Sequence, residues 1–151
     1  MASWRAAFTL LWFPAATMAA AETAPDAVAI VEGAVPSALT DVPGDPANGR
    51  KVYAARSLGN CLACHATSDQ ASEQFHGDVG PPMDGVADRY DVAQLRAIIV
   101  NAKAVFGEDT IMPGFYTLEY GANPAERFVG KTILSAQDVE DVVAYLETLK
   151  E

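Results

Sequence analysis

Apolar residues recur at helical spacing near the C-terminal end of the chain. Ser135 and Asp138 resemble a capping box, in which each side chain bonds the backbone of the other residue. An apolar stripe follows, formed by Val139, Val142, Val143, Leu146 and Leu149. The pattern predicts the last helix of the protein, with one face turned toward a core.

Two earlier segments also favour helices. Asp45-Pro46 combines a preferred N-cap with a residue tolerated in the first turn, and Gly59-Asn60 stops the helix that should run to about Ser57. A second helix is predicted from Asp91 to about Ala102. Its apolar face comprises Leu95, Ile98, Ile99 and Ala102.

The segments between these helices are long and irregular. Residues 66–90 and 104–134 hold most of the Gly and Pro of the chain, and structureless loops of this length in a compact domain are usually functional. In this chain the two long loops would have to surround a bound group. Residues 22–44 contain Pro25, Pro36 and Pro43, which favours an irregular N-terminal extension. The predicted organisation is therefore one mostly helical domain, 45–151, preceded by this extension.

Residues 1–21 have the pattern of a secretory signal peptide. Arg5 precedes a short apolar run broken by Pro14, and Ala19 and Ala21 supply an A-x-A cleavage pattern. An uncleaved membrane anchor is the alternative, but the apolar run is short for a span. We expect cleavage after Ala21, export to the bacterial periplasm, and no membrane span afterwards.

Charge narrows the range of partners. The formal net charge of the whole chain is −10, and loss of Arg5 with the signal peptide would leave nine Lys and Arg against twenty Asp and Glu, a net of −11. Such an acidic protein is not expected to bind nucleic acid or an anionic membrane surface. A basic protein partner would suit it better.

The candidate chemistry lies in the sequence Cys61-Leu62-Ala63-Cys64-His65, the attachment pattern of c-type haem. Two thiols separated by one helical turn can add to the two vinyl groups of the porphyrin, and the following imidazole can bind iron. Export strengthens this interpretation, because haem is attached to such proteins outside the cytoplasm. We therefore predict one covalent haem c.

The two cysteines allow three other interpretations. A thioredoxin-like redox pair expects a βαβ context, and this chain reads as helical. A zinc site needs four ligands, of which only His76 could complete the set, at a spacing unlike that of a zinc finger. A structural disulfide across so short a loop would stabilise little.

The sixth iron ligand has three candidates, namely His76, Met83 and Met112. A chain must travel round the porphyrin to reach its opposite face, which favours a distant loop residue. Met112 meets this condition, and Pro113 holds it in extended backbone. We assign Met112. If Met112 is ordinary core, the iron would be five-coordinate or bound by His76, and Met83 is the further candidate.

These residues resemble class I cytochromes c, and the resemblance covers roughly residues 45–151. It implies an all-α fold with three main helices and long loops wrapped around one haem. In that class a proline carbonyl accepts a hydrogen bond from the ligand imidazole, a role that falls on Pro81. Met83 would pack on the ring, and His76 would be an exposed loop residue. In the same class, a Gly of the first helix makes room for an aromatic ring of the last helix. Gly49, Tyr53 and Tyr145 match these positions, so we expect Gly49 to admit the ring of Tyr145.

Finer features resemble the SoxX family, the small monohaem cytochromes of the SoxAX complex of bacterial sulfur oxidation. The resemblance rests on the order and spacing of Asn60, Leu95-Arg96 and the segments 109–116, 130–134 and 139–146. Gly114 departs from the pattern, since a bulkier residue or a second Pro is common there.

The resemblance to SoxX implies a specific role. The chain would form a heterodimer with a SoxA-like cytochrome, in a complex that oxidatively conjugates thiosulfate to a cysteine of the carrier SoxYZ. It would pass electrons to a small acceptor cytochrome c and would not be catalytic alone. The alternative is a free-standing, diffusible periplasmic cytochrome c that shuttles electrons. The extension 22–44 favours the subunit, since a free shuttle has little use for it.

Overall fold

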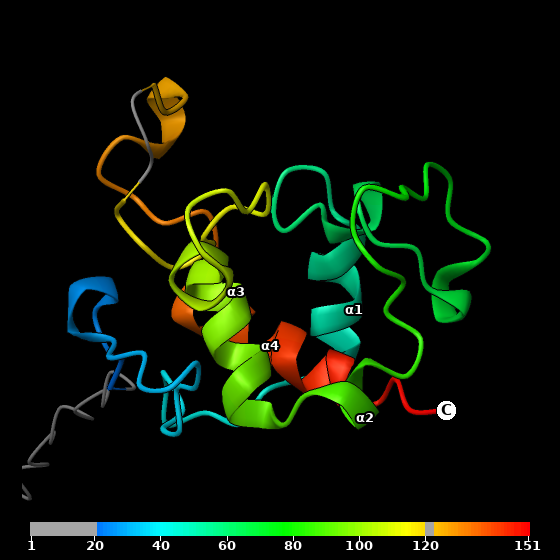
Figure 1. Ribbon diagram of the computed structural model, residues 1–151, viewed down its shortest axis with the longest axis horizontal. Coiled ribbons are helices and arrows are strands. Elements are labelled where there is room, and N and C mark those ends of the chain that lie inside the picture. Colours follow the sequence, from blue (N-terminus) through cyan, green and yellow to red (C-terminus); the bar gives the residue numbers. More distant parts are fainter. Residues whose placement is uncertain (1–20, 120–122) are drawn as a thin grey trace, which may run out of the picture.

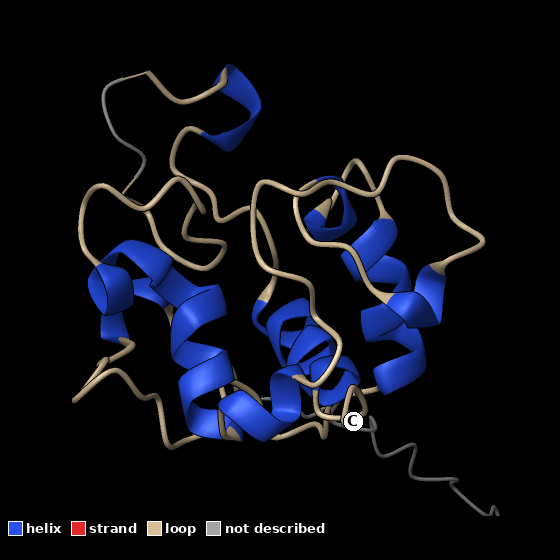
Figure 2. Cartoon of the chain, turned by 45° about the vertical axis from the view of Figure 1, so that its right-hand side comes forward, coloured by secondary structure: helices blue, strands red, loops and turns tan. Residues whose placement is uncertain are grey.

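The computed structural model describes residues 21–119 and 123–151. Its α-helices are α1 (Pro46–Ala54), α2 (Val86–Arg89), α3 (Val92–Phe106) and α4 (Ala136–Leu146). Short 3-10 turns lie at Pro25–Ala27, Cys61–Ala63, Ser68–Gln70 and Glu126–Phe128. Among the described residues no strand forms, and helices are joined by long loops (Figures 1 and 2). The predicted all-α fold is confirmed.

Local capping fixes where the helices begin. The Asp45 carboxylate accepts a hydrogen bond from the Ala47 amide at the start of α1. Asp91 with Gln94, and Ser135 with Asp138, form reciprocal capping boxes at the starts of α3 and α4. All three predicted helix starts are confirmed.

The helix ends differ from the prediction. α1 ends at Ala54 and not near Ser57, because Ala55 already has extended backbone (φ −69°, ψ 117°). α3 continues past Ala102 to Phe106, but its backbone breaks at Asn101 (φ −154°, ψ 91°). The carbonyls of Ile99 and Val100, just before this break, accept hydrogen bonds from the amides of Phe115 and Tyr116. Tertiary contacts with a distant loop therefore shape the second half of α3.

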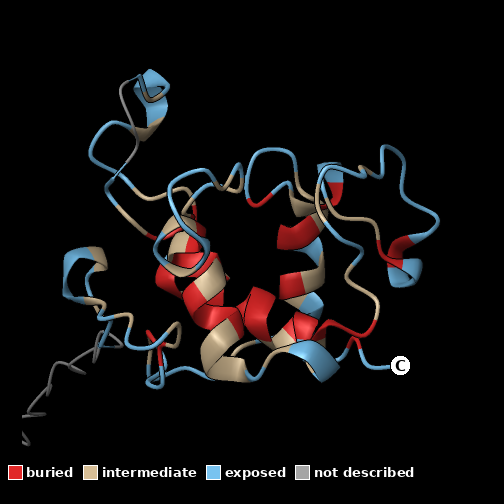
Figure 3. Cartoon of the chain, viewed as in Figure 1, coloured by how far each residue is buried: buried red, intermediate tan, exposed pale blue. Residues whose placement is uncertain are grey.

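Helix α4 packs against both α1 and α3, and most buried residues gather along it and on the sides that face it (Figure 3). α1 approaches α4 closely at Gly49. A Cβ atom there would overlap the Asp141 carbonyl oxygen and lie 2.9 Å from the Cβ atom of Tyr145. The predicted meeting point of the first and last helices is confirmed, although Gly49 makes room for the α4 backbone and not for the ring of Tyr145.

The extension 22–44 is bound to the domain. Val35 and Leu39 are buried, and the Val35 amide donates to the Ala93 carbonyl at 2.9 Å. The Tyr116 hydroxyl contacts Glu22 Oε1 at 2.8 Å and the Thr23 carbonyl at 2.7 Å. This segment is thus part of the folded core. Its presence therefore does not favour a subunit of a complex over a free electron shuttle.

A buried ion pair connects α3, α4 and the extension. The Arg96 guanidinium donates to both Glu140 carboxylate oxygens, at 2.7 and 3.0 Å, and to the Val35 carbonyl at 2.7 Å. Glu140 Oε1 also accepts from the Leu39 amide at 2.9 Å. Arg96 and Glu140 are each only 5% exposed, so the pair and its two backbone partners satisfy one another away from water.

Candidate haem site

A cavity of about 680 Å³ opens between α3 and the loops that follow α1. Its walls come from three parts of the chain: Leu95, Ile98 and Ile99 of α3, Val142 and Leu146 of α4, and the loops around Cys61, Pro81 and Met112. Most of these side chains are apolar. The two long loops predicted to wrap around something therefore border one shared space.

The two thiols lie on one tight turn at the edge of this cavity. Cys61 begins a 3-10 turn after Asn60, whose backbone is left-handed (φ 51°). The amides of Cys64 and His65 both bond back to the Cys61 carbonyl, at 3.0 and 2.8 Å. This places Cys61, Cys64 and His65 together on the lining. Burial raises the pKa of the free Cys61 thiol to about 12.

The ring and the backbone of His65 are each held by a hydrogen bond. The ring Nδ1 lies 2.8 Å from the Pro81 carbonyl oxygen, which leaves Nε2 as the ring nitrogen available for another contact. The Tyr53 hydroxyl donates to the His65 backbone carbonyl at 2.7 Å. A Cβ atom at position 80 would overlap the imidazole, so Gly80 permits the chain to pass beside the ring.

Met112 approaches the same cavity from a different loop. This loop is anchored just after Met112, where the amides of Phe115 and Tyr116 bond to the carbonyls of Ile99 and Val100 on α3. Met112 is half-buried and packs against the hydrophobic core. The chain therefore returns a thioether to the cavity 47 residues after His65.

The other two candidates are placed differently. Met83 lines the cavity and packs against the core, with its amide bonded to the Ala66 carbonyl. His76 is an exposed loop residue, as predicted, and does not line the cavity. Its Nε2 contacts the Gln70 carbonyl at 3.0 Å. Met83 and Met112 line the cavity and therefore remain candidates for the sixth iron ligand, whereas His76 does not line it.

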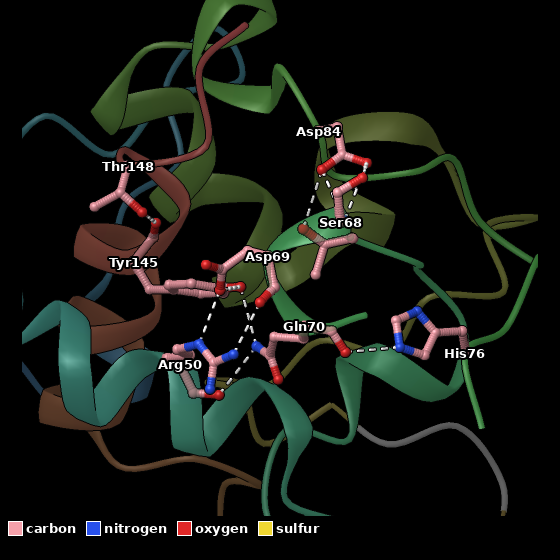
Figure 4. Close-up of polar contacts among 9 residues, drawn as sticks. Arg50, Ser68, Asp69, Gln70, His76, Asp84, Tyr145 and Thr148 are labelled. Carbon is pink, nitrogen blue, oxygen red and sulfur yellow. Dashed lines mark hydrogen bonds and ion pairs between the residues drawn. The ribbon is translucent and has the colours of Figure 1, made fainter. Parts of the chain in front are cut away.

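A polar network next to Tyr53, which lines the cavity, was not predicted from the sequence. The rings of Tyr53 and Tyr145 meet edge to face, with centroids 5.5 Å apart. The Tyr145 hydroxyl contacts Asp69 Oδ2 at 2.9 Å, and Asp69 also pairs with Arg50 at 2.8 Å (Figure 4). Burial and the neighbouring Asp69 raise the pKa of Tyr145 to about 12. The network ties α1 and α4 to the loop that follows the Cys-x-x-Cys-His segment; in the sequence its members were visible only as separate polar residues.

These residues fit a haem c. The cavity lies within the usual 300–1,000 Å³ of cofactor sites and is lined mainly by apolar side chains. The free thiols of Cys61 and Cys64 lie on one turn. The Nδ1 of the following imidazole is hydrogen-bonded, which leaves Nε2 for iron, and the Met112 thioether reaches the cavity from a separate loop. When bound, haem supplies a one-electron iron couple.

Comparison with known proteins shows the family of this chain. The sequence profile of the cytochrome c family, described as "Cytochrome c", matches residues 46–150. A chain in the crystal structure of SoxXA from P. pantotrophus is 47% identical, with a TM-score of 0.79, over 86% of this chain and 99% of that one. No curated protein matched in the sequence comparison.

Two other solved structures are more distant. The c-type cytochrome SorU from Sinorhizobium meliloti is 24% identical, with a TM-score of 0.45, over 70% of this chain and 90% of that one. Ferric cytochrome c-550 from Paracoccus versutus is 18% identical, with a TM-score of 0.39, over 72% of this chain and 99% of that one. These values are too low to add to the assignment, which rests on the family profile and on SoxXA. The chain belongs to the cytochrome c family, as a SoxX-like electron-transfer cytochrome that carries haem c.

Proposed function

We propose that Cys61 and Cys64 hold the haem through two thioether bonds, and that His65 and Met112 are its axial ligands. The support is their placement: one turn carries both thiols and the imidazole, and a separate anchored loop carries the thioether. The Pro81 carbonyl would keep the proton of His65 on Nδ1, so that Nε2 faces the metal.

This ligand set would suit electron transfer. With both axial positions filled by protein, no position remains for a substrate. A thioether is a soft ligand that favours reduced iron and so raises the reduction potential relative to a nitrogen ligand. The sequence has two cysteines, both of which would become thioethers, so the chain has no free thiol to carry a sulfur intermediate. We therefore place substrate chemistry on another subunit.

We propose that this other subunit is a SoxA-like cytochrome, with which the chain forms a heterodimer. The observation that carries this proposal is the 47% identity to a chain of SoxXA over 86% of the protein. The complex would oxidatively conjugate thiosulfate to a cysteine of SoxYZ. Joining thiosulfate to a thiol as a disulfide-type S–S bond releases two electrons and one proton. The chain, holding a single one-electron cofactor, would pass these electrons one at a time to a small acceptor cytochrome c.

Export to the periplasm is part of the same proposal. The predicted signal peptide, 1–21, lies almost wholly outside the described residues. Within the described residues, none of the helices has the length and apolar character needed to cross a membrane. N-terminal sequencing of the purified protein should begin at Glu22 if cleavage follows Ala21.

The proposal is tested by purification from the native organism grown on thiosulfate. A SoxA-like cytochrome should co-purify in equal amount, and Met112→Ala should slow thiosulfate-dependent reduction of the acceptor cytochrome while leaving the haem ligation of the partner unchanged. A protein that stays monomeric beside its co-expressed SoxA neighbour would point to the diffusible shuttle. Thiosulfate oxidation that continues unchanged after deletion of the gene would contradict any role in it.

A further inference from the structure

The turn that carries the Pro81 carbonyl is fastened on both sides of that residue. Before it, the Gly80 amide donates to the Cys64 carbonyl at 3.0 Å. After it, the Met83 amide donates to the Ala66 carbonyl at 2.9 Å. Both acceptors are immediate neighbours of His65. The position of the Pro81 carbonyl relative to the imidazole therefore depends on how the turn 80–85 is held against residues 64–68.

One carboxylate strengthens this attachment. Asp84 accepts from the Ser68 amide at 2.9 Å (Oδ1) and 3.2 Å (Oδ2), from the Ser68 hydroxyl at 3.1 Å and from the Thr67 hydroxyl at 3.3 Å (Figure 4). Hydrogen bonds to a charged acceptor are the stronger kind. The Ser68 amide is also the main reason that the pKa of Asp84 lies below its usual value. Asp84 is thus an ionised staple between the turn and the segment after His65.

Arg89 of α2 holds the same turn from its other side. The guanidinium donates to the Asp84 carbonyl at 2.8 Å and to the Pro82 carbonyl at 2.9 Å. Arg89 is exposed to solvent, whereas Thr67, one of the hydrogen-bond donors to Asp84, is buried. We therefore expect Asp84 to contribute more than Arg89 to the geometry of the turn.

We propose that Asp84 is a positioning residue for the axial imidazole: by binding Thr67 and Ser68 it fixes the Pro81 carbonyl against His65 Nδ1. This rests on the proposed role of His65 as an iron ligand. A well-placed carbonyl makes the imidazole a stronger donor, which stabilises oxidised iron and lowers the reduction potential. Loosening the turn would raise the potential and expose the Nδ1 proton to exchange.

Two matched variants separate positioning from charge. Asp84→Ala removes both the charge and the acceptors. Asp84→Asn removes the charge but keeps one oxygen for the Ser68 amide, and its NH₂ can donate to the Ser68 hydroxyl. Asp88→Ala removes a nearby exposed carboxylate whose bond is to the Glu151 amide, outside the turn. The reduction potential of the purified holoprotein and the exchange rate of the His65 Nδ1 proton, followed by NMR, are measured for each.

The proposal predicts a raised potential and about tenfold faster exchange in Asp84→Ala, the equivalent of ~1.4 kcal/mol. Asp84→Asn should shift both quantities less than Asp84→Ala, because its side-chain amide keeps part of the attachment to Ser68, and Asp88→Ala should stay near the unmodified protein. Equal shifts in Asp84→Asn and Asp84→Ala would overturn the proposal in favour of charge alone, as would an unchanged exchange rate in Asp84→Ala. If Asp84→Ala fails to mature, Ser68→Ala keeps every charge and the Ser68 amide but removes the hydroxyl bond to Asp84. It should raise the potential in the same direction by a smaller amount, and no shift there would overturn the proposal.

The same spectra distinguish this failure from failure of the ligand assignment. In the ferric protein, ring protons of an iron-bound imidazole are strongly shifted by the unpaired electron. Shifted His65 signals with no effect of Asp84 would reject positioning and keep the ligand. Unshifted His65 signals would reject the ligand, and with it the positioning role that depends on it.

Discussion

The buried ion pair between Arg96 and Glu140 allows a quantitative test of how the extension is held. Glu140→Leu would leave the Arg96 guanidinium, 5% exposed, without its carboxylate, and the Leu39 amide without its acceptor. Removing one partner of a buried pair typically costs about 3–5 kcal/mol. Arg96→Leu should cost about the same, because it leaves the Glu140 charge buried and the Val35 carbonyl without a donor.

The double variant decides whether the two side chains act as one unit. Replacing both by leucine removes both charges, and leaves the Val35 carbonyl and the Leu39 amide unpaired at ~1–3 kcal/mol each. The double variant should therefore lose about 2–6 kcal/mol, whereas independent effects would add to about 6–10 kcal/mol.

The assay is guanidinium unfolding of the ferric holoprotein followed by far-UV circular dichroism, with limited proteolysis to detect release of residues 22–44. We expect each single variant to release the extension more readily, since two of its backbone contacts, at the Val35 carbonyl and the Leu39 amide, depend on the pair. Additive losses in the double variant, or single-variant losses below about 1 kcal/mol, would refute the reasoning.

Three other predictions follow from the structure. Gly49→Val should lower the free energy of unfolding by about 1–3 kcal/mol through overpacking against Asp141, whereas Lys51→Ala, an exposed control on α1, should not; a neutral Gly49→Val would contradict the observed crossing. Asp84, whose pKa is lowered mainly by the Ser68 amide, should contribute stability that is present above pH 3.8 and lost as the pH falls below it; an acid titration should show a flatter profile for Asp84→Ala in this range. Haem should remain with the denatured protein and add one haem to its mass, and haem extracted by acidic acetone would contradict the covalent attachment.

The sequence predicted features that are encoded locally. Asp45, Asp91 and Ser135 each bond the amides just after them, so the helix starts could be read from neighbouring residues. The predicted apolar stripe is likewise buried, although its last member, Leu149, lies beyond the end of α4. The turn at Cys61–Ala63 is closed by hydrogen bonds among neighbouring backbone groups, which explains why the cysteine spacing was informative about the site.

Features that depend on distant residues were not predicted. The break at Asn101 accompanies hydrogen bonds from Phe115 and Tyr116, which periodicity within α3 cannot reveal. The pairing of Arg96 with Glu140 spans 44 residues, and without it residues 22–44 read as a loose extension. Asp84 gave no local signal either, because its function in the turn becomes visible only when the turn lies against Thr67 and Ser68.

The central claim is that the haem is held between His65 and Met112, and one measurement tests it most directly. Ferric haem bound by a methionine shows a weak near-infrared absorption band. The purified protein should show this band, Met112→Ala should lose it and have a lower reduction potential, and Met83→Leu should keep it, because we assign Met83 to packing on the haem and Met112 to the iron. A band that survives in Met112→Ala and disappears in Met83→Leu would contradict the account and transfer the ligand role to Met83.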